Sequence, residues 1–210
     1  LMQPEEYEAW LSEVLEAVAF ITGFAPADIH LKRRERQKGT QQYEKTGKAG
    51  ADFIVHEHGR RFWVNLEKYL DTGLFLDHRN TRQRVGEMAA GKRFLNLFAY
   101  TGSFSVYAAT GGAAASETVD LSNTYLDWAR RNFELNGIDE ARHQIVRADV
   151  FQYLQAAAQA GKPFDLIVMD PPSFSNSKKM LDILDIQRDH MRLIDGAMAL
   201  LASDGLLFFS

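Results

Sequence analysis

The chain has 210 residues, which is room for one hydrophobic core or for one core with a small appended subdomain. Hydrophobic residues make up 46% and charged residues 25%, the balance of a soluble globular protein, and no apolar run is long enough to span a membrane. The sequence contains no cysteine, which excludes disulfides, thiolate zinc sites and a cysteine nucleophile. The start shows no signal peptide, so we expect a cytoplasmic protein.

The net charge of -4 is unevenly distributed along the chain. Residues 32–48 hold seven basic and two acidic side chains, which gives this segment +5 and leaves -9 for the rest. A basic segment on an acidic protein predicts an anionic partner, RNA or DNA first, although a solvated surface hairpin explains the charges equally well. The side chains that we expect foremost at RNA phosphates are Lys32, Arg33, Arg34, Arg36 and Lys38.

Residues 4–20 are predicted to form a helix, with Pro4 at its first position and Gly23 and Pro26 beyond its end. Its apolar side chains recur at helical spacing, which predicts one packed face made of Tyr7, Trp10, Leu11, Val14, Leu15 and Val18. Residues 53–65 then read as two short strands with "EHGR" as the hairpin turn. His56 and His58 have no third ligand nearby, so we expect strand residues facing solvent rather than a metal site.

From about Phe75 onward, strand-length apolar runs alternate with helical segments. Strands are predicted at 92–98, 116–120, 143–149, 165–170 and from 206, and helices at 103–112, 123–137, 150–161 and 186–205. Asn123 is the expected cap of the second helix. This order predicts an α/β fold with a doubly wound, Rossmann-like sheet, preceded by a small α+β subdomain at residues 1–74. Because Ser210 falls inside the last predicted strand, we expect the domain at 75–210 to be truncated at its C-terminus.

Acidic residues and a glycine turn follow the predicted strands, where an open α/β sheet binds its ligand. Gly102 permits a tight turn into a helix, and Asp120, 18 residues further on, suits a ribose diol. Asp149 is placed to receive an exocyclic amine. A dinucleotide site needs G-x-G-x-x-G and only one glycine is present, so S-adenosylmethionine is favoured over a nicotinamide cofactor.

The segment "DPPSF" ends the fourth strand of this unit. Pro171 and Pro172 stiffen the backbone and leave its carbonyls free to accept hydrogen bonds from an amino group. Phe174 is then placed to stack on an extruded base. A rigid loop with a core phenylalanine is the alternative interpretation.

At these residues the sequence resembles a known family. The segments "RRERQKGTQQYEK", "TGLFLDHRNTR", "NLFAYTGSFS", "VDLSNTYLDWARRNFELNG" and "DPPSFSNSKKM" look like the C-terminal half of the bacterial bifunctional 23S ribosomal RNA methyltransferase, a half similar to enzymes that methylate N7 of guanine. The resemblance covers essentially the whole chain and implies the class I methyltransferase fold. It also implies ribosomal RNA as partner, no metal, no membrane, and a second methyltransferase half before this one.

The resemblance assigns roles to two groups of residues, one at the cofactor and one at the target base. The residues implied at the cofactor are Asn96, Phe98, Tyr100, Thr101 and Gly102 at its methionine end, Asp120, Leu121 and Ser122 at the ribose, Asp149 and Val150 at the adenine, and Phe75, Asp77 and Arg79 over the methionine carboxylate. The residues implied at the target base are Asp170, Pro171, Pro172 and Phe174.

The chemistry of methyl transfer limits which base can be the target. Methylation of cytosine C5 needs a cysteine, which the chain lacks. Guanine N7 has an in-plane lone pair and needs only alignment with the methyl group, which makes Asp170 a positioning group and not a proton acceptor. An exocyclic amine target, a non-catalytic RNA-binding module of the same fold, and a nicotinamide oxidoreductase remain as alternatives.

Overall fold

The computed structural model describes residues 3–32, 50–69, 71–172, 174–175 and 184–210. Its centre is a sheet of five parallel strands in the order β5-β4-β3-β6-β9. The strands are β3 (Arg93–Leu97), β4 (Ala115–Asp120), β5 (His143–Arg147), β6 (Phe164–Met169) and β9 (Leu201–Phe209). The chain moves outward from β3 to β5 and then returns to β6, so the order reverses between β3 and β6. This is the doubly wound sheet that the sequence predicts.

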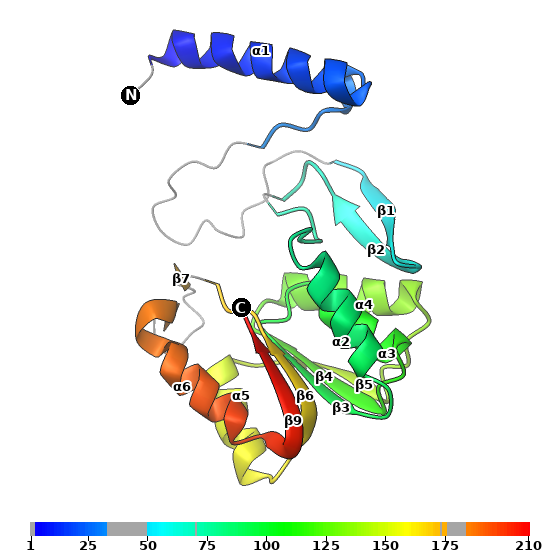
Figure 1. The fold of residues 1–210 in the computed structure, drawn as a ribbon, viewed down its shortest axis with the longest axis vertical. Coiled ribbons are helices and arrows are strands. Elements are labelled where there is room, and N and C mark those ends of the chain that lie inside the picture. Colours follow the sequence, from blue (N-terminus) through cyan, green and yellow to red (C-terminus); the bar gives the residue numbers. More distant parts are fainter. Residues whose placement is uncertain (1–2, 33–49, 70, 173, 176–183) are drawn as a thin grey trace.

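Helices cover both faces of the sheet (Figure 1). One face carries α2 (Arg79–Met88), α3 (Ser103–Thr110) and α4 (Asn123–Leu135), and the other carries α5 (Val150–Gln159) and α6 (Ile186–Met198). Side chains alternate along each strand, so Leu95 and Leu97 join the core beneath α5 and α6 while Phe94 joins the core beneath α2 and α3. Burial on both faces explains why these strands read as continuous apolar runs.

A β-hairpin of β1 (Asp52–Glu57) and β2 (Arg60–Asn65) precedes the sheet, as predicted. Its two turn residues both have positive φ, 47° at His58 and 79° at Gly59, as a tight two-residue hairpin turn requires. His56 lies exposed on its strand, but the expectation of a strand position for His58 is wrong. His58 occupies the turn, where its Nδ1 lies 3.0 Å from the hydroxyl of Tyr107.

Side chains of α4 bind the open edge of β2 and fasten the hairpin to the sheet domain. Trp128 donates to the carbonyl of Trp63 at 2.8 Å, and Asn132 accepts from the N–H of the same residue at 2.9 Å. Asn136 both accepts from and donates to the backbone of Arg61. Trp128 and Asn132 of α4 and its C-cap Asn136, spaced four apart, therefore meet strand residues spaced two apart. Whether an independent subdomain ends at residue 74 stays a prediction.

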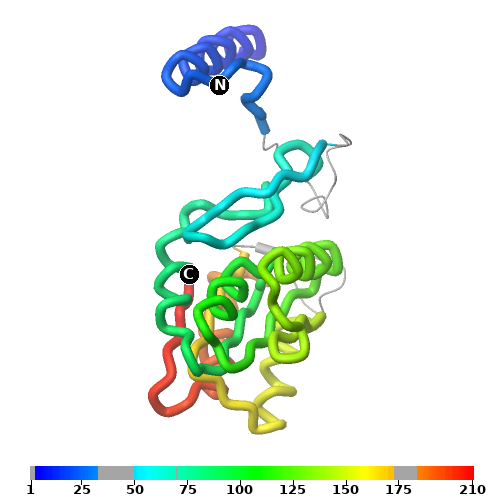
Figure 2. Tube along the Cα trace, turned by 90° about the vertical axis from the view of Figure 1, so that its right-hand side faces the viewer, coloured from blue at the N-terminus to red at the C-terminus, as the bar shows by residue number. Residues whose placement is uncertain are grey.

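The first helix, α1 (Pro4–Thr22), ends at Gly23 as predicted and continues into the short 3-10 helix η1 (Pro26–Asp28). Figure 2 shows α1 apart from the sheet, with the hairpin between them. The predicted packed face is wrong, because only Leu11 of the six apolar residues is buried and Trp10 is 47% exposed. The spacing of apolar residues indicates an amphipathic helix but not what covers it. No helix within the described residues is long and apolar enough to cross a membrane.

Three local predictions need correction. The sequence does not predict helix α2, because its residues are mostly polar and only Arg82, Val85 and Gly86 are buried. The cap of α4 is Ser122, whose hydroxyl accepts from the N–H of Tyr125, and not Asn123. The last helix ends at Met198, and β9 begins at Leu201 with an irregular pairing before Leu206. A further short pair, β7 (Phe174–Ser175) with β8 (Leu184–Asp185), lies between β6 and α6.

Candidate functional site

Four chain segments meet at the carboxyl ends of the parallel strands, and we call them the strand-end site. They are 98–102 after β3, 120–122 after β4, 148–150 after β5 and 170–172 after β6. The segments after β3 and β6 flank the point where the strand order reverses. Open α/β sheets bind their ligands at such a point.

The segment after β3 has an unusual backbone. Phe98 and Tyr100 have φ values of 56° and 52°, which non-glycine residues adopt only when their surroundings enforce it, and Gly102 has 71°. A Cβ on Gly102 would also lie 3.0 Å from that of Ala129, so glycine serves both the turn and the packing of α4. Phe98 and Tyr100 are half-buried at the strand-end site. Strain of this kind clusters at functional sites, which supports a binding role for this segment.

Asp120 binds two backbone N–H groups in the same part of the site. Its Oδ2 accepts from the N–H of Tyr100 at 2.9 Å and its Oδ1 from the N–H of Ser122 at 2.8 Å. Burial raises the pKa of the Asp120 carboxyl to about 6, although the backbone N–H groups of Ser122, Tyr100 and Leu121 oppose the rise. A carboxylate has about four acceptor positions, and the bonds from Tyr100 and Ser122 leave some of them for a ligand. Asp120 therefore remains able to accept from a ligand hydroxyl.

Asn96 and Thr101 lie beneath the strand-end site instead of facing it. Asn96 is 2% exposed and donates to the hydroxyl of Ser105, which also accepts from Thr118. Thr101 is fully buried and donates to the carbonyl of Gly73 at 2.7 Å. Asn96 thus links β3 to α3, and Thr101 links the segment after β3 to Gly73.

A residue that the sequence analysis did not single out, Gly73, holds that segment from outside. The N–H of Gly73 donates to the hydroxyl of Tyr100 at 2.9 Å, and its carbonyl accepts from Thr101, so one residue is held at two points. The ring of Phe75 lies 5.2 Å from the ring of Tyr100 and is 42% exposed. Burial raises the pKa of the Tyr100 hydroxyl, which keeps this group neutral and able to accept from Gly73.

Replacing Gly73 with Ala is expected to lower the free energy of unfolding by about 2–4 kcal/mol. Its φ is 102°, and a Cβ would lie 2.2 Å from the ring of Trp128, so both the backbone and the packing must yield. Gly59→Ala is a matched control, since Gly59 also has positive φ but open space around it, and should cost about 1 kcal/mol. Urea denaturation of both variants measures the difference; equal losses would mean that Trp128 moves aside freely.

The segments after β4 and β5 also begin helices. Ser122 caps α4, and Leu121 is half-buried beside it. Asp149 is 7% exposed and caps α5, with its Oδ1 accepting from Phe151 and Gln152, and Val150 is buried behind it. Ser122, assigned by resemblance to the ribose, and Asp149, assigned to the adenine, therefore also cap the helices that follow them.

Asp170 follows β6 and contacts a histidine that the sequence analysis overlooked. Nε2 of His78, the cap residue of α2, lies 3.2 Å from Oδ2 of Asp170. Burial raises the pKa of the Asp170 carboxyl, the charge of Asp77 raises it further, and His78 lowers it. Pro171 is buried and Pro172 half-buried, while Phe174 begins β7, so the predicted stacking of its ring stays a prediction. Arg79 begins α2 and is exposed.

A buried ion pair holds the segment before α2. Arg82 is 1% exposed and binds both carboxylate oxygens of Glu57, at 2.9 and 3.0 Å. Its remaining nitrogen donates to the carbonyl of Phe75 at 2.7 Å, and Tyr107 donates to the same carboxylate. The hairpin is thereby linked through one guanidinium to the residues beside the strand-end site.

Of the five basic residues predicted to contact RNA, the structure describes Lys32. Lys32 donates to the carbonyls of Asn65 and Tyr69, and burial lowers its pKa, so its ammonium group is engaged within the fold. The other four predicted RNA contacts, Arg33, Arg34, Arg36 and Lys38, lie outside the described residues.

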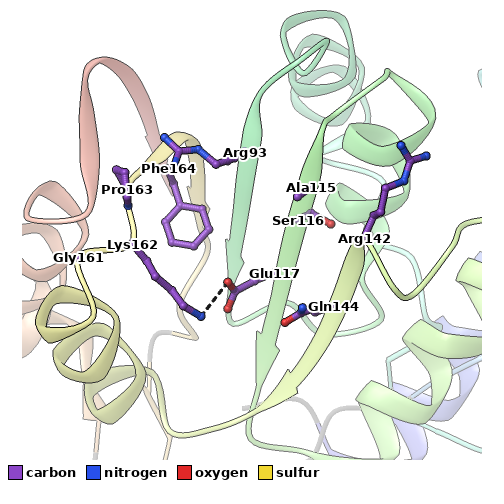
Figure 3. Close-up of a pocket in the computed structure, with 10 residues that line it drawn as sticks. All are labelled: Arg93, Ala115, Ser116, Glu117, Arg142, Gln144, Gly161, Lys162, Pro163 and Phe164. Carbon is purple, nitrogen blue, oxygen red and sulfur yellow. Dashed lines mark hydrogen bonds and ion pairs between the residues drawn. The ribbon is translucent and has the colours of Figure 1, made fainter.

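A separate hollow lies at the other end of the strands from the strand-end site (Figure 3). It is lined by the amino ends of the strands, including Arg93, Glu117 and Phe164. Lys162 pairs with Glu117 at 3.3 Å and Arg93 with Asp165, so carboxylates already neutralise these two cations. In the described parts of the chain, no three His, Asp or Glu side chains are grouped as metal ligands.

Comparison with known proteins points to one family. The sequence model of the S-adenosylmethionine-dependent methyltransferases matches residues 2–208. Ribosomal RNA large subunit methyltransferase K of Neisseria meningitidis serogroup B is 82% identical over all 210 residues, and the chain spans 59% of that protein. Ribosomal RNA large subunit methyltransferase K/L of Chromohalobacter salexigens is 55% identical over 209 residues, and the chain spans 28% of it.

Solved structures agree with the fold. The structure of SMU.776 complexed with SAH has a TM-score of 0.72 and 39% identity, covering 77% of this chain and 42% of that one. A SAM-dependent methyltransferase from Agrobacterium tumefaciens has a TM-score of 0.70 and 25% identity, covering 78% of this chain and 53% of that one.

Proposed function

The chain belongs to the S-adenosylmethionine-dependent methyltransferase family, and from that premise we propose that it methylates N7 of a guanine in large-subunit ribosomal RNA. The observation that carries the proposal is the strand-end site, where Asp120 and Asp170 follow strands on either side of β3 in a methyltransferase sheet. The RNA substrate is supported by relatives named ribosomal RNA large subunit methyltransferases. These relatives are longer than this chain, which supports a second half in the whole protein. The proposal also places the protein in the cytoplasm.

The strand-end site fits S-adenosylmethionine by its donor and acceptor groups. Asp120 keeps acceptor capacity for the two ribose hydroxyls, and Asp149 has a second carboxylate oxygen for the adenine amine. The strained segment with Phe98 and Tyr100 is proposed to line the methionine end, with Asn96 and Thr101 supporting it from below and Phe75, Asp77 and Arg79 at the outer side. When bound, this cofactor supplies an electrophilic methyl group.

The proposed methyl transfer requires the protein mainly to align guanine N7 with the methyl group. N7 of guanine attacks with a lone pair in the ring plane, so no side chain has to remove a proton. Asp170 and the stiff Pro171-Pro172 backbone are proposed to orient the base, with Phe174 stacked on its face. The chain has no cysteine for covalent attack on a cytosine ring.

Methyl transfer by the full-length protein onto deproteinised ribosomal RNA tests the proposal. Digestion to nucleosides and mass spectrometry should find 7-methylguanosine, and the modified RNA should be cleaved by aniline after borohydride reduction, a lability that methylation of an exocyclic amine does not create. Product methylated at an exocyclic amine would replace the N7 assignment. Binding of RNA and cofactor without any product would favour a non-catalytic module.

Binding of S-adenosylmethionine is expected to weaken as the pH falls through about 6, the pKa of the Asp120 carboxyl. The ionised carboxylate accepts both ribose hydroxyls, whereas the protonated form has lost one acceptor, so affinity should be constant from pH 7 to 8. Below the pKa it should fall by up to about tenfold per pH unit. Calorimetry from pH 5 to 8 measures this; a profile that is flat throughout would remove Asp120 from the ribose.

The basic segment is proposed to contact RNA phosphates through Arg33, Arg34, Arg36 and Lys38, with Lys32 anchoring its start. Reversing the charge of Arg33, Arg34 and Arg36 is expected to weaken RNA binding and to reduce the slope of log affinity against log salt by roughly 0.7–0.9 for each phosphate that the protein no longer neutralises. Arg142→Glu at the opposite edge of the sheet is the control and should leave the slope unchanged. A slope unaltered by the triple variant would mean that the segment does not touch phosphate.

A further inference from the structure

Three ionisable groups from two distant parts of the sequence meet beside the end of β6. His78 occupies the N-cap position of α2 without a side-chain capping bond, and its Nε2 lies 3.2 Å from Oδ2 of Asp170, 92 positions later in the chain. The carboxylate of Asp77 accepts from the N–H of His78 at 3.1 Å and acts electrostatically on Asp170. The side chains are 18% exposed at His78 and 36% at Asp170, so the pair lies at the surface of the site but is partly shielded from water.

His78 contacts its neighbours through both its backbone and its ring. The backbone carbonyl of His78 accepts from the N–H of Arg82 at 2.8 Å in the first turn of α2, and its ring lies 5.6 Å from the ring of Phe104 on α3. The guanidinium of Arg82 is itself fixed to Glu57 and to the carbonyl of Phe75. A side chain on a helix end that is anchored in this way can fix the geometry of a partner better than a mobile loop can.

Among the described residues, one oxygen of Asp170 has a partner and the other has none. Oδ2 faces His78, while within the described part of the chain Oδ1 has no hydrogen-bond or ion-pair partner. The residue that follows, Pro171, has no N–H to donate to it. Asp170 thus presents one fixed oxygen and one open oxygen at the strand-end site.

We infer that His78 is a positioning residue for methyl transfer: it holds Oδ2 of Asp170 so that Oδ1 accepts a hydrogen bond from N1–H of the target guanine. This inference rests on the proposed function and deepens it. Guanine presents acceptors at N7 and O6, so a carboxylate cannot bind that edge, whereas N1–H and the 2-amino group on the opposite edge are donors. Asp170 is therefore matched to the edge of the base that points away from the reacting nitrogen.

The pair also suits the charge that develops in the reaction. As N7 forms its bond to the methyl carbon, the electron pair of the carbon–sulfur bond stays with sulfur and the purine ring becomes cationic. N1–H keeps its proton but becomes a stronger donor. An ionised Asp170 at N1–H therefore stabilises the transition state more than the ground state. Burial and Asp77 oppose the ionisation of Asp170, and His78 favours it.

His78→Ala in the full-length protein tests the inference. The single-turnover rate of methyl transfer to ribosomal RNA is expected to fall about 10- to 100-fold, since a misplaced carboxylate loses alignment with the base. Cofactor affinity should stay within about twofold, as the proposed cofactor contacts do not involve His78, and the variant should stay folded at the assay temperature. The acid limb of the pH–rate profile should move to higher pH, because Asp170 loses the neighbour that favours its ionised form. His190→Gln on α6, whose ring contacts carbonyls of its own helix, is the matched control.

A direct titration separates this inference from the proposed function. The pKa of the Asp170 carboxyl, followed by carbon NMR with cofactor bound and no RNA, should rise in His78→Ala. An unchanged Asp170 pKa, an unchanged rate, or a rate loss that follows cofactor affinity without a shift of the acid limb would each overturn the role of His78. The identity of the methylated nucleoside made by the unaltered protein tests the N7 assignment separately.

Discussion

Replacing Arg82 with Met should lower the free energy of unfolding by about 3–5 kcal/mol, because the carboxylate of Glu57 is left buried without its cation. Glu57 is 5% exposed, and both its oxygens bind the guanidinium. Methionine fills a similar volume, so the loss reports the uncompensated charge and not a cavity. The carbonyl of Phe75 also loses its donor, which should loosen the segment beside Tyr100.

Chemical denaturation of the purified variant measures this loss. Arg84→Met is the matched control, since Arg84 lies two positions later on the same helix and is exposed, and its effect should be within about 0.5 kcal/mol. Adding Glu57→Gln to Arg82→Met should recover part of the stability, as an amide does not need a cation. A double variant no more stable than the single one would show that packing, and not charge, dominates the site.

Replacing Asp120 with Ala is expected to weaken S-adenosylmethionine binding by about 100-fold or more. Two hydrogen bonds to a charged acceptor are lost, each contributing about 1.5–3 kcal/mol. The fold should survive, because the substitution also removes a carboxylate whose ionisation is disfavoured by burial, as its pKa of about 6 indicates. The backbone N–H groups of Tyr100 and Ser122 lie next to the site and are then open to water.

Calorimetry with S-adenosylmethionine and with its demethylated product checks this prediction. Asp127→Ala provides the control, since Asp127 is an exposed carboxylate of α4 that pairs with Arg130. The Asp120→Ala variant should in addition lose the weakening of binding below pH 6. Retained affinity would place the ribose elsewhere along the strand ends.

The periodic part of the fold was predictable from the sequence. Apolar runs such as residues 165–170 are continuous because helices cover both faces of the sheet, and the chain order of strands and helices then determines a doubly wound topology. The acids at positions 120 and 170 followed from the same logic, since a strand that ends in a polar residue delivers it to the carboxyl edge. The "EHGR" segment, with Gly59 in the turn, correctly predicted the hairpin.

Other features depend on contacts between distant residues. Nothing near His78 in the sequence indicates that it faces Asp170, because the contact arises only when α2 packs beside β6. The two-point support of Gly73 by Tyr100 and Thr101 has the same origin. For α1, the apolar spacing indicated a helix correctly but could not indicate its environment, and Trp10 remains exposed.

The reversal of strand order has a consequence for how the protein is synthesised. Of the central sheet, β3, β4 and β5 emerge from the ribosome first and can assemble in succession, each beside the previous strand. The inner edge of β3 stays unpaired until β6 has been made, about 70 residues later, and exposes the backbone of Phe94 to Leu97 in that interval. The nascent chain therefore exposes a strand edge that can pair with other chains during elongation. Pairing of β6 with that edge also brings residues 170–172 to the strand-end site.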